Sequence, residues 1–196
     1  MTTKLVDKVK VPADRFELRL SGSGGQGMIL GSVIMSEAVG IMDQRNVVQT
    51  QSYGPEARGG ASKADVVISP NEIFYPKAMK LDLLLAMTQE SMDKYYQDLK
   101  PGGTLVIDNV LVTDVPTDDY YGLPFTRLAK EQAGHIMVAN VIALAAIAEI
   151  TGLVTRDALE KAVLARAPRG TEEKNRKAIE IGFAEAAKLK ERRGGK

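Results

Sequence analysis

The sequence predicts an α/β protein of three layers, in which a largely parallel sheet carries helices on both faces and is followed by a helical C-terminal segment. Short apolar runs alternate with longer helical patterns over residues 16–150, as is typical of strand–helix–strand units. The run Leu81–Met87 is apolar almost throughout, which indicates a strand covered on both faces. Beyond residue 155 only helical patterns remain.

Strands are expected where short apolar runs end at turn residues. The first run stops at a glycine-rich turn, and Pro76 ends a brief run that predicts an edge strand at Ile73–Tyr75. The segment Pro101–Gly103 separates a helix from the last strand. The expected strands of the sheet are Phe16–Leu20, Val47–Gln51, Ala61–Ser69, Leu81–Met87 and Thr104–Ile107.

Helices are expected where apolar residues recur at helical spacing between capping residues. Gly40 is the expected end of the first helix, which is apolar nearly all round and is therefore expected to be buried. Thr88 and Thr155 are expected N-caps. The expected helices are Gln26–Val39, Gln89–Leu99, Phe125–Gln132, Ala139–Ile150, Thr155–Arg166 and Thr171–Arg193.

Length and composition predict one globular domain over the 196 residues, with a core at about 15–150 and C-terminal helices at about 155–193. A formal net charge of +1 and the absence of tryptophan argue against nucleic acid as a partner. Residues 1–11 do not resemble a signal peptide, and Ile136–Ile150 is too short to span a membrane. We therefore expect a soluble, cytoplasmic protein.

A glycine-rich turn joins the first strand to the first helix. It consists of Gly22, Ser23, Gly24, Gly25, Gln26 and Gly27. Glycines let a ligand approach the backbone, and a helix N-terminus presents free N–H groups to an anion. The glycines also match the G-x-G-x-x-G spacing of dinucleotide sites. Three interpretations stay open. The turn could bind a ligand anion, it could bind a nicotinamide or flavin dinucleotide, or it could serve only the packing of the helix on the sheet.

The second strand argues against the dinucleotide. Such sites use an acidic residue at the tip of that strand to hold the ribose hydroxyl groups. The strand here ends in Gln49, Thr50 and Gln51, and Asp43 precedes the strand instead of ending it.

The segment from Ser52 to Gly60 has no hydrophobic periodicity. A Gly-Pro pair and a Gly-Gly pair bracket Glu56 and Arg58. One interpretation is an ordinary surface loop. The other is a shaped binding loop that holds Tyr53, Glu56 and Arg58 in place, because loops at the strand ends of such sheets are where ligands and partners meet.

No catalytic residue and no metal site are predicted. The chain has no cysteine, which excludes thiolate nucleophiles and cysteine-ligated clusters from it. The single histidine, His135, is interpreted as a capping or packing residue, and Asp108 as the cap of a turn. A binding arrangement without a nucleophile or base suggests a binding or assembly subunit.

Two motifs together carry a resemblance. The segments Gly22–Gly27 and Gln51–Gly60, about 25 residues apart, resemble the paired signatures of the gamma subunit of 2-oxoacid:ferredoxin oxidoreductases. The resemblance extends from Phe16 to Ala178 and implies a single gamma-type domain of the pyruvate/ketoisovalerate oxidoreductases with a Rossmann-like sheet. The sequence of the segment Gln49–Lys63 is most similar to that of the members that act on 2-oxoglutarate.

The resemblance implies a complex that decarboxylates a 2-oxoacid oxidatively, forms its acyl-CoA and reduces ferredoxin. It places thiamine diphosphate and Mg²⁺ between alpha and beta subunits, and iron–sulfur clusters in the beta or a delta subunit. This chain would contribute to assembly and to coenzyme A contacts and would be inactive alone. The residues that would face coenzyme A or neighbouring subunits are Gly22, Ser23, Gly24, Gly25, Gln26, Gly27, Tyr53, Gly54, Pro55, Glu56, Arg58, Gly59 and Gly60. A free-standing nucleotide-binding protein and a purely structural scaffold are the alternatives.

Overall fold

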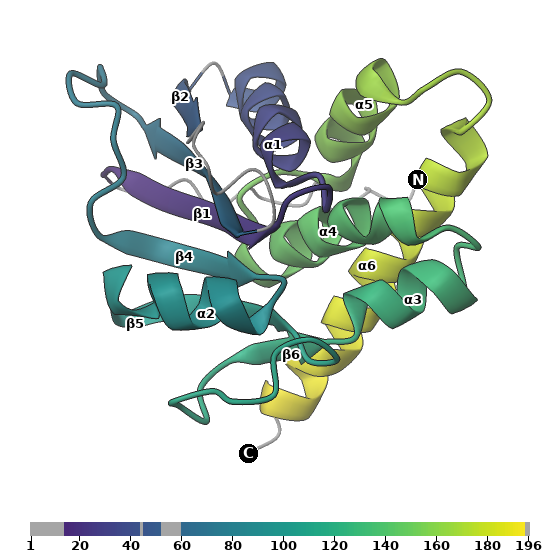
Figure 1. The fold of residues 1–196 in the computed structure, drawn as a ribbon. Coiled ribbons are helices and arrows are strands. Elements are labelled where there is room, and N and C mark those ends of the chain that lie inside the picture. Colours follow the sequence, from purple (N-terminus) through teal and green to yellow (C-terminus); the bar gives the residue numbers. More distant parts are fainter. Residues whose placement is uncertain (1–13, 44, 52–59, 195–196) are drawn as a thin grey trace.

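A six-stranded sheet forms the centre of the molecule (Figure 1). The structure is a computed structural model that describes residues 14–43, 45–51 and 60–194. The strand order across the sheet is β2-β3-β1-β4-β5-β6. The strands are β1 (Phe16–Ser23), β2 (Asn46–Gln51), β3 (Ala61–Ser69), β4 (Leu81–Ala86), β5 (Leu99–Asp108) and β6 (Tyr121–Leu123).

The sheet is mostly parallel, as predicted. Strands β1, β4, β5 and β6 form parallel neighbours, whereas β3 is antiparallel to both β1 and β2. Strand β2 therefore runs in the same direction as β1 but is separated from it by β3. The carboxyl ends of the five strands that share a direction lie at one edge of the sheet, together with the amino end of β3.

Helices cover both faces of the sheet, as predicted, but unequally (Figure 1). Helix α2 packs with Met92 and Tyr95 against one face of β4 and β5. The other helices gather on the opposite face, where the larger apolar core lies. The helices are α1 (Met28–Asp43), α2 (Gln89–Tyr95), α3 (Phe125–Glu131), α4 (Ala139–Thr151), α5 (Arg156–Arg166) and α6 (Glu172–Gly194), with single 3-10 turns η2 (Tyr96–Asp98) and η3 (Ile136–Val138).

The centre of the larger core is the contact between α4 and the C-terminal helix α6. Residues 139–148 of α4 are all buried. A Cβ atom on Gly182 of α6 would lie 2.4 Å from the carbonyl oxygen of Ile142 and 2.6 Å from the Cβ of Ala145. The two helix backbones therefore approach so closely that only glycine fits at this position.

The predicted capping residues are confirmed. Thr88 forms a capping box with Ser91 at the start of α2, and the hydroxyl oxygen of Thr155 accepts a hydrogen bond from the Ala158 amide. The predicted end of the first helix at Gly40 is wrong, because α1 continues to Asp43. Gly40 does not adopt the positive φ that ends helices such as α4 at Gly152.

The predicted edge strand at Ile73–Tyr75 does not form. Side chains before and in β1 take the backbone groups that a strand partner would bind: Arg15 donates to the carbonyl oxygen of Tyr75, and Glu17 accepts from the amide of Met79. Conversely, strand β6 lies in the segment 113–124, which is rich in turn residues. It pairs with the carboxyl end of β5.

No described helix combines the length and the apolar character that crossing a membrane requires.

Candidate functional site at the carboxyl edge of the sheet

The fold brings the ends of the two predicted motifs to the same sheet edge. Ser23 at the end of β1 pairs with Ala61 at the start of β3, and the Ser62 hydroxyl donates to the carbonyl oxygen of Gly22 over 3.2 Å. Strand β2 ends at Gln51 on this edge. Ligands of α/β sheets bind at such carboxyl edges.

Of the second motif, the structure describes Gly60, which directly precedes β3 and is partly buried. The remaining predicted residues of that motif lie outside the described residues, and their roles stay predictions. These residues are Tyr53, Gly54, Pro55, Glu56, Arg58 and Gly59.

The glycine turn is closed by its own glutamine. The backbone amide of Gln26 donates to the carbonyl oxygen of Ser23 over 3.3 Å, and the side-chain oxygen of Gln26 accepts from the backbone amide of Ser23 over 2.8 Å. Gly25 and Gly27 have φ values of +90° and +74°, which are strained for any other residue. Gln26 therefore stabilises the turn through these hydrogen bonds, and Gly24 and Gly25 are exposed to solvent.

A buried asparagine holds the turn from the other side. Asn140 in the first turn of α4 is 4% exposed, and its side-chain amide donates to the carbonyl oxygen of Gly27 over 3.2 Å. A Cβ atom on Gly27 would lie 2.5 Å from that nitrogen. At Gly22 a Cβ atom would lie 2.4 Å from the side-chain oxygen of Gln26. Glycine is therefore favoured at position 27 by the buried Asn140 and by the positive φ there, whereas a side chain at position 22 would displace the Gln26 side chain that closes the turn. Sequence reasoning missed Asn140.

The exposed part of the turn borders a hollow of about 310 Å³. Its lining comes from the turn, from the chain after β5, and from the segment that enters α4. The lining residues are Gly25, Gln26, Leu111, Thr126, Ile136, Met137 and Ala139. The lining is mostly apolar and contains no charged side chain.

A second hollow, of about 350 Å³, lies between α1, α4, α5 and the start of α6. Its walls are mainly apolar, and His135, Arg166 and Lys174 contribute polar groups. Met137 lines both hollows, so the turn η3 is the partition between them.

Four exposed apolar side chains line the two hollows, and we call them the apolar ridge. Met137 is 59% exposed and Ile136 is 52% exposed. The members of the ridge are Leu30, Leu111, Ile136 and Met137. Exposed apolar side chains that gather in one place mark interaction surfaces, whereas isolated ones do not.

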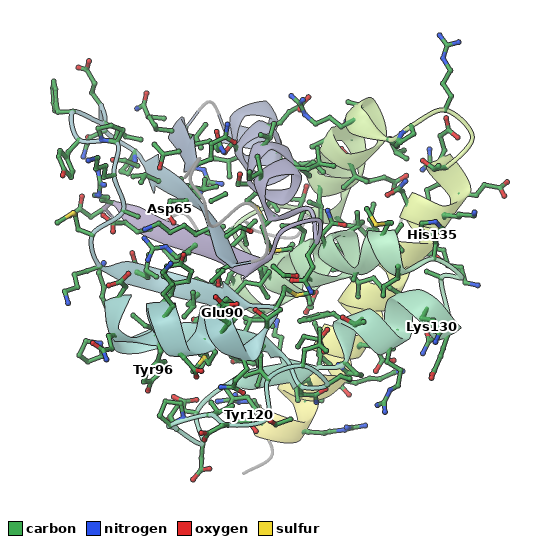
Figure 2. All side chains as sticks on the ribbon, viewed as in Figure 1. Asp65, Glu90, Tyr96, Tyr120, Lys130 and His135 are labelled. Carbon is green, nitrogen blue, oxygen red and sulfur yellow. The ribbon has the colours of Figure 1, made fainter. Side chains whose placement is uncertain are left out.

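The two polar residues predicted as caps are confirmed in that role. Asp108 is fully buried, and its carboxylate accepts hydrogen bonds from the Val110 amide, the Thr126 amide and the Thr126 hydroxyl. The Nδ1 atom of His135 accepts a hydrogen bond from the backbone amide of Met137 over 3.2 Å. In Figure 2, His135 lies on the opposite side of the molecule from the buried Asp65. Within the described residues no cluster of three or more histidine or acidic side chains could hold a metal ion.

The sheet topology adds to the case against a dinucleotide. A Rossmann site takes its ribose-binding acid from the strand beside β1. Here that neighbour is the antiparallel strand β3, which has only its amino end at this edge, and β2 lies one strand further away.

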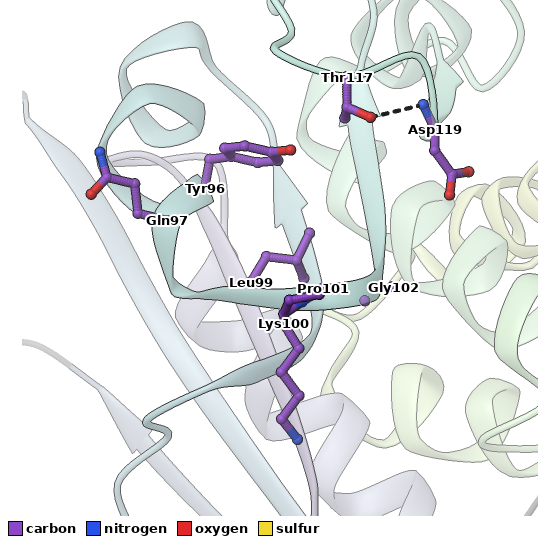
Figure 3. A pocket seen from close by; sticks show the side chains of 9 residues that line it. Tyr96, Gln97, Leu99, Lys100, Pro101, Gly102, Thr117 and Asp119 are labelled. Atoms are coloured by element: carbon purple, nitrogen blue, oxygen red, sulfur yellow. Dashed lines mark hydrogen bonds between the residues drawn. The ribbon is translucent and has the colours of Figure 1, made fainter.

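A third hollow, of about 320 Å³, lies at the opposite edge of the sheet (Figure 3). Several of its polar groups bind neighbours within the chain. The Lys100 ammonium points away from the hollow and pairs with Asp82 at 2.8 Å, and the Thr117 hydroxyl accepts from the amide of Asp119. This hollow is therefore the weaker candidate for a ligand.

Comparisons with known proteins show the family of the chain. The family model for pyruvate ferredoxin/flavodoxin oxidoreductase matches residues 17–185. The 2-oxoglutarate synthase subunit KorC of Methanocaldococcus jannaschii is 48% identical over 179 residues, which cover 89% of this chain and 96% of the relative. The corresponding subunit of Methanothermobacter marburgensis is 45% identical over 176 residues, or 86% of this chain and 95% of the relative.

Solved structures show the same fold. The gamma subunit of a keto/oxoacid ferredoxin oxidoreductase from Geobacter sulfurreducens superposes with a TM-score of 0.83 at 47% identity, over 90% of this chain and 99% of that one. A 2-oxoglutarate:ferredoxin oxidoreductase from Magnetococcus marinus, solved with 2-oxoglutarate, coenzyme A and succinyl-CoA bound, superposes with a TM-score of 0.78 over 90% of this chain and 32% of that one. Its identity of 20% supports the fold alone.

These matches confirm the resemblance that the two glycine motifs carry, including the greater similarity to 2-oxoglutarate members. They also confirm the prediction of an oxidoreductase subunit, which implies other subunits in the complex. The chain belongs to the pyruvate ferredoxin/flavodoxin oxidoreductase family, as a subunit of the gamma type.

Proposed function

We propose that this chain acts in a 2-oxoglutarate:ferredoxin oxidoreductase complex, where it supplies a docking surface for other subunits and part of the coenzyme A site. The complex would convert 2-oxoglutarate to its acyl-CoA with loss of carbon dioxide and pass the electrons to ferredoxin. The names of the closely similar relatives support the substrate.

The observation that carries the proposal is the apolar ridge beside a glycine turn that is fixed from two sides. Apolar and aromatic side chains form the centres of protein interfaces, and methionine is enriched there. The turn is held by Gln26 from within and by Asn140 from α4, so its exposed part has a fixed shape. A rigid site loses less entropy when a ligand or partner binds.

Coenzyme A fits the chemistry of this edge only in part. Gly24 and Gly25 leave the backbone open at the N-terminus of α1, where N–H groups and the helix dipole favour phosphate. The mostly apolar hollow of about 310 Å³ suits an uncharged arm of the coenzyme. That volume is at the lower end for ligand pockets, so another surface would complete the site. When bound, the coenzyme supplies the thiol that accepts the acyl group.

The remaining cofactors and partners are proposed from the family resemblance. Alpha and beta subunits would hold thiamine diphosphate and Mg²⁺, and the beta or a delta subunit would hold the iron–sulfur clusters that reduce ferredoxin. The absence of cysteine from this chain is consistent with that division. The cytoplasmic location stays a prediction.

The docking role is tested by placing a charge on the ridge. We expect Met137→Glu to reduce recovery of the other subunits with a tagged copy of the chain at least tenfold, because a buried unpaired carboxylate is costly at an interface. Ala184→Glu, an equivalent change at an exposed position of α6, is the control. Unchanged recovery with Met137→Glu would contradict the docking role.

The coenzyme role is tested in the assembled complex. Leu111 lines the hollow and its neighbour Val110 does not, and both are exposed to a similar extent. Leu111→Ala should raise the KM for coenzyme A about tenfold, which corresponds to roughly 1.4 kcal/mol of lost apolar contact, and leave the KM for 2-oxoglutarate unchanged. Val110→Ala should change neither value. Equal effects of both variants on the KM for coenzyme A would favour a purely structural scaffold. Binding of NAD, but not of coenzyme A, to the isolated chain would favour a free-standing nucleotide-binding protein.

A further inference from the structure

The loop between β3 and β4, residues 70–80, presents three apolar side chains to solvent. Phe74 is 86% exposed, Met79 is 61% exposed and Tyr75 is 52% exposed. The Tyr75 hydroxyl donates to the sulfur of Met79 over 3.8 Å. The loop projects beyond the start of β4, at the edge of the sheet opposite to the glycine turn (Figure 1). Three exposed large apolar side chains within six positions are typical of an interaction surface.

Two charged residues at the start of β1 fix the shape of this loop. Glu17 is 5% exposed, and it pairs with Arg15 at 2.6 Å. The two side chains bind four backbone groups of the loop over 2.6–2.8 Å. Arg15 donates to the carbonyl oxygens of Tyr75 and Lys77, and Glu17 accepts from the backbone amides of Met79 and Lys80. The exposed side chains are therefore held on a preorganised support, which is a property of interface anchors.

The charge around the patch is mainly positive. Lys77 and Lys80 flank Met79 and are exposed, and neither ammonium pairs with a described residue. Glu72 is the single acidic residue within residues 70–80. A partner surface that fits this loop would carry carboxylates around an apolar depression.

We propose that the loop 70–80 is a second docking surface, which inserts Phe74 and Met79 into an apolar depression, rimmed by carboxylates, on a different polypeptide. A second copy of this chain fits poorly, because a two-fold contact centred on the loop would bring Lys77 and Lys80 near the same lysines of the other copy. Residues 1–13 also fit poorly, since they contain three lysines and one aspartate. The chain would then contact two neighbours through opposite edges of its sheet.

The test uses a photoreactive side chain in the assembled complex. Replacing Phe74 by p-benzoylphenylalanine keeps an aromatic ring at an exposed position and leaves the core untouched. We expect irradiation to join this chain to an acidic segment of a different subunit, identified by mass spectrometry. The same replacement at Ala184 controls for random collisions and should not yield that product. A product within residues 1–13, a product between two copies, or no product at position 74 would overturn the proposal.

A second measurement separates this surface from the ridge. Phe74→Ala should lower the affinity of the chain for that subunit at least tenfold, and the Lys77→Glu, Lys80→Glu double variant should lower it further at low ionic strength. Both variants should melt like the unmodified chain because the changed side chains are exposed. Wild-type affinity of both would contradict the second surface without affecting the result for Met137→Glu.

Discussion

The buried guanidinium of Arg19 borders the smaller apolar core, which contains Met92 and Tyr95. Arg19 is 2% exposed and binds Asp65 through two parallel hydrogen bonds of 2.6 Å and 2.9 Å. A third bond joins it to Asp98, and the Tyr95 ring lies 5.1 Å from the guanidinium carbon. This cluster ties β1 to β3 and to the turn after α2, so replacing Asp65 should destabilise the fold.

The magnitude follows from the geometry of the three bonds. Asp65→Ala removes two of them and leaves a buried cation with Asp98 alone. Breaking a buried ion pair costs about 3–5 kcal/mol, and the remaining carboxylate places the expected loss near the lower value, about 3 kcal/mol. Asp98→Ala should cost about 1 kcal/mol, because the Asp98 side chain is 45% exposed and water can replace it.

Arg19 carries its positive charge at neutral pH. Burial lowers the pKa of the guanidinium, but hydrogen bonds and attraction from Asp65 and Asp98 outweigh burial and leave the pKa raised above its ordinary value. A pKa that is higher in the folded state than in the unfolded state contributes stability that is complete below the unfolded value. Titration of Arg19 should therefore reduce stability only at strongly alkaline pH.

Urea unfolding of the full chain, followed by circular dichroism, measures these differences. Asp118→Ala, at an exposed aspartate, is the matched control and should stay within about 0.5 kcal/mol of the unmodified chain. Asp65→Asn keeps the shape and one acceptor and should fall between Asp65→Ala and the unmodified chain. A loss below 1 kcal/mol for Asp65→Ala, or one no larger than for Asp98→Ala, would refute the reasoning.

Three further predictions concern the backbone and are checked by thermal melting. Gly182→Ala should lower Tm although alanine favours helices by about 1 kcal/mol, because its Cβ atom would lie 2.4 Å from the carbonyl oxygen of Ile142; a higher Tm would contradict the close packing. Gly27→Ala should destabilise more than Gly25→Ala, since both have positive φ but only at Gly27 would the new Cβ atom lie 2.5 Å from the buried side-chain nitrogen of Asn140; equal losses would count against that close approach. Thr88→Ala should cost about 1 kcal/mol as the cap of α2 is lost, and an unchanged Tm would show that the cap is not needed.

The local features of this protein could be predicted from its sequence because they depend on neighbouring residues. Periodicity located the strands β1 to β4 and four of the six α-helices to within a few residues, and hydroxyl side chains located the caps at Thr88 and Thr155. The longer α1 and the strand β6 were exceptions. Helix α2 was also expected to reach Leu99 but ends at Tyr95, and β5 begins at Leu99, so that Pro101–Gly103 lie inside the strand and not before it. The glycine turn was also visible, since its spacing is a local property.

Only the tertiary structure decided how these parts are combined. The amide of Asn140 reaches the glycine turn across 113 residues of sequence, and Arg15 and Glu17 shape a loop about 60 residues away. Strand β3 separates β2 from β1, and no local pattern reports strand order. Such contacts depend on which surfaces meet when the chain collapses, so the sequence by itself determined the elements and the motifs, and the packing decided which of their residues face solvent, a neighbour or each other.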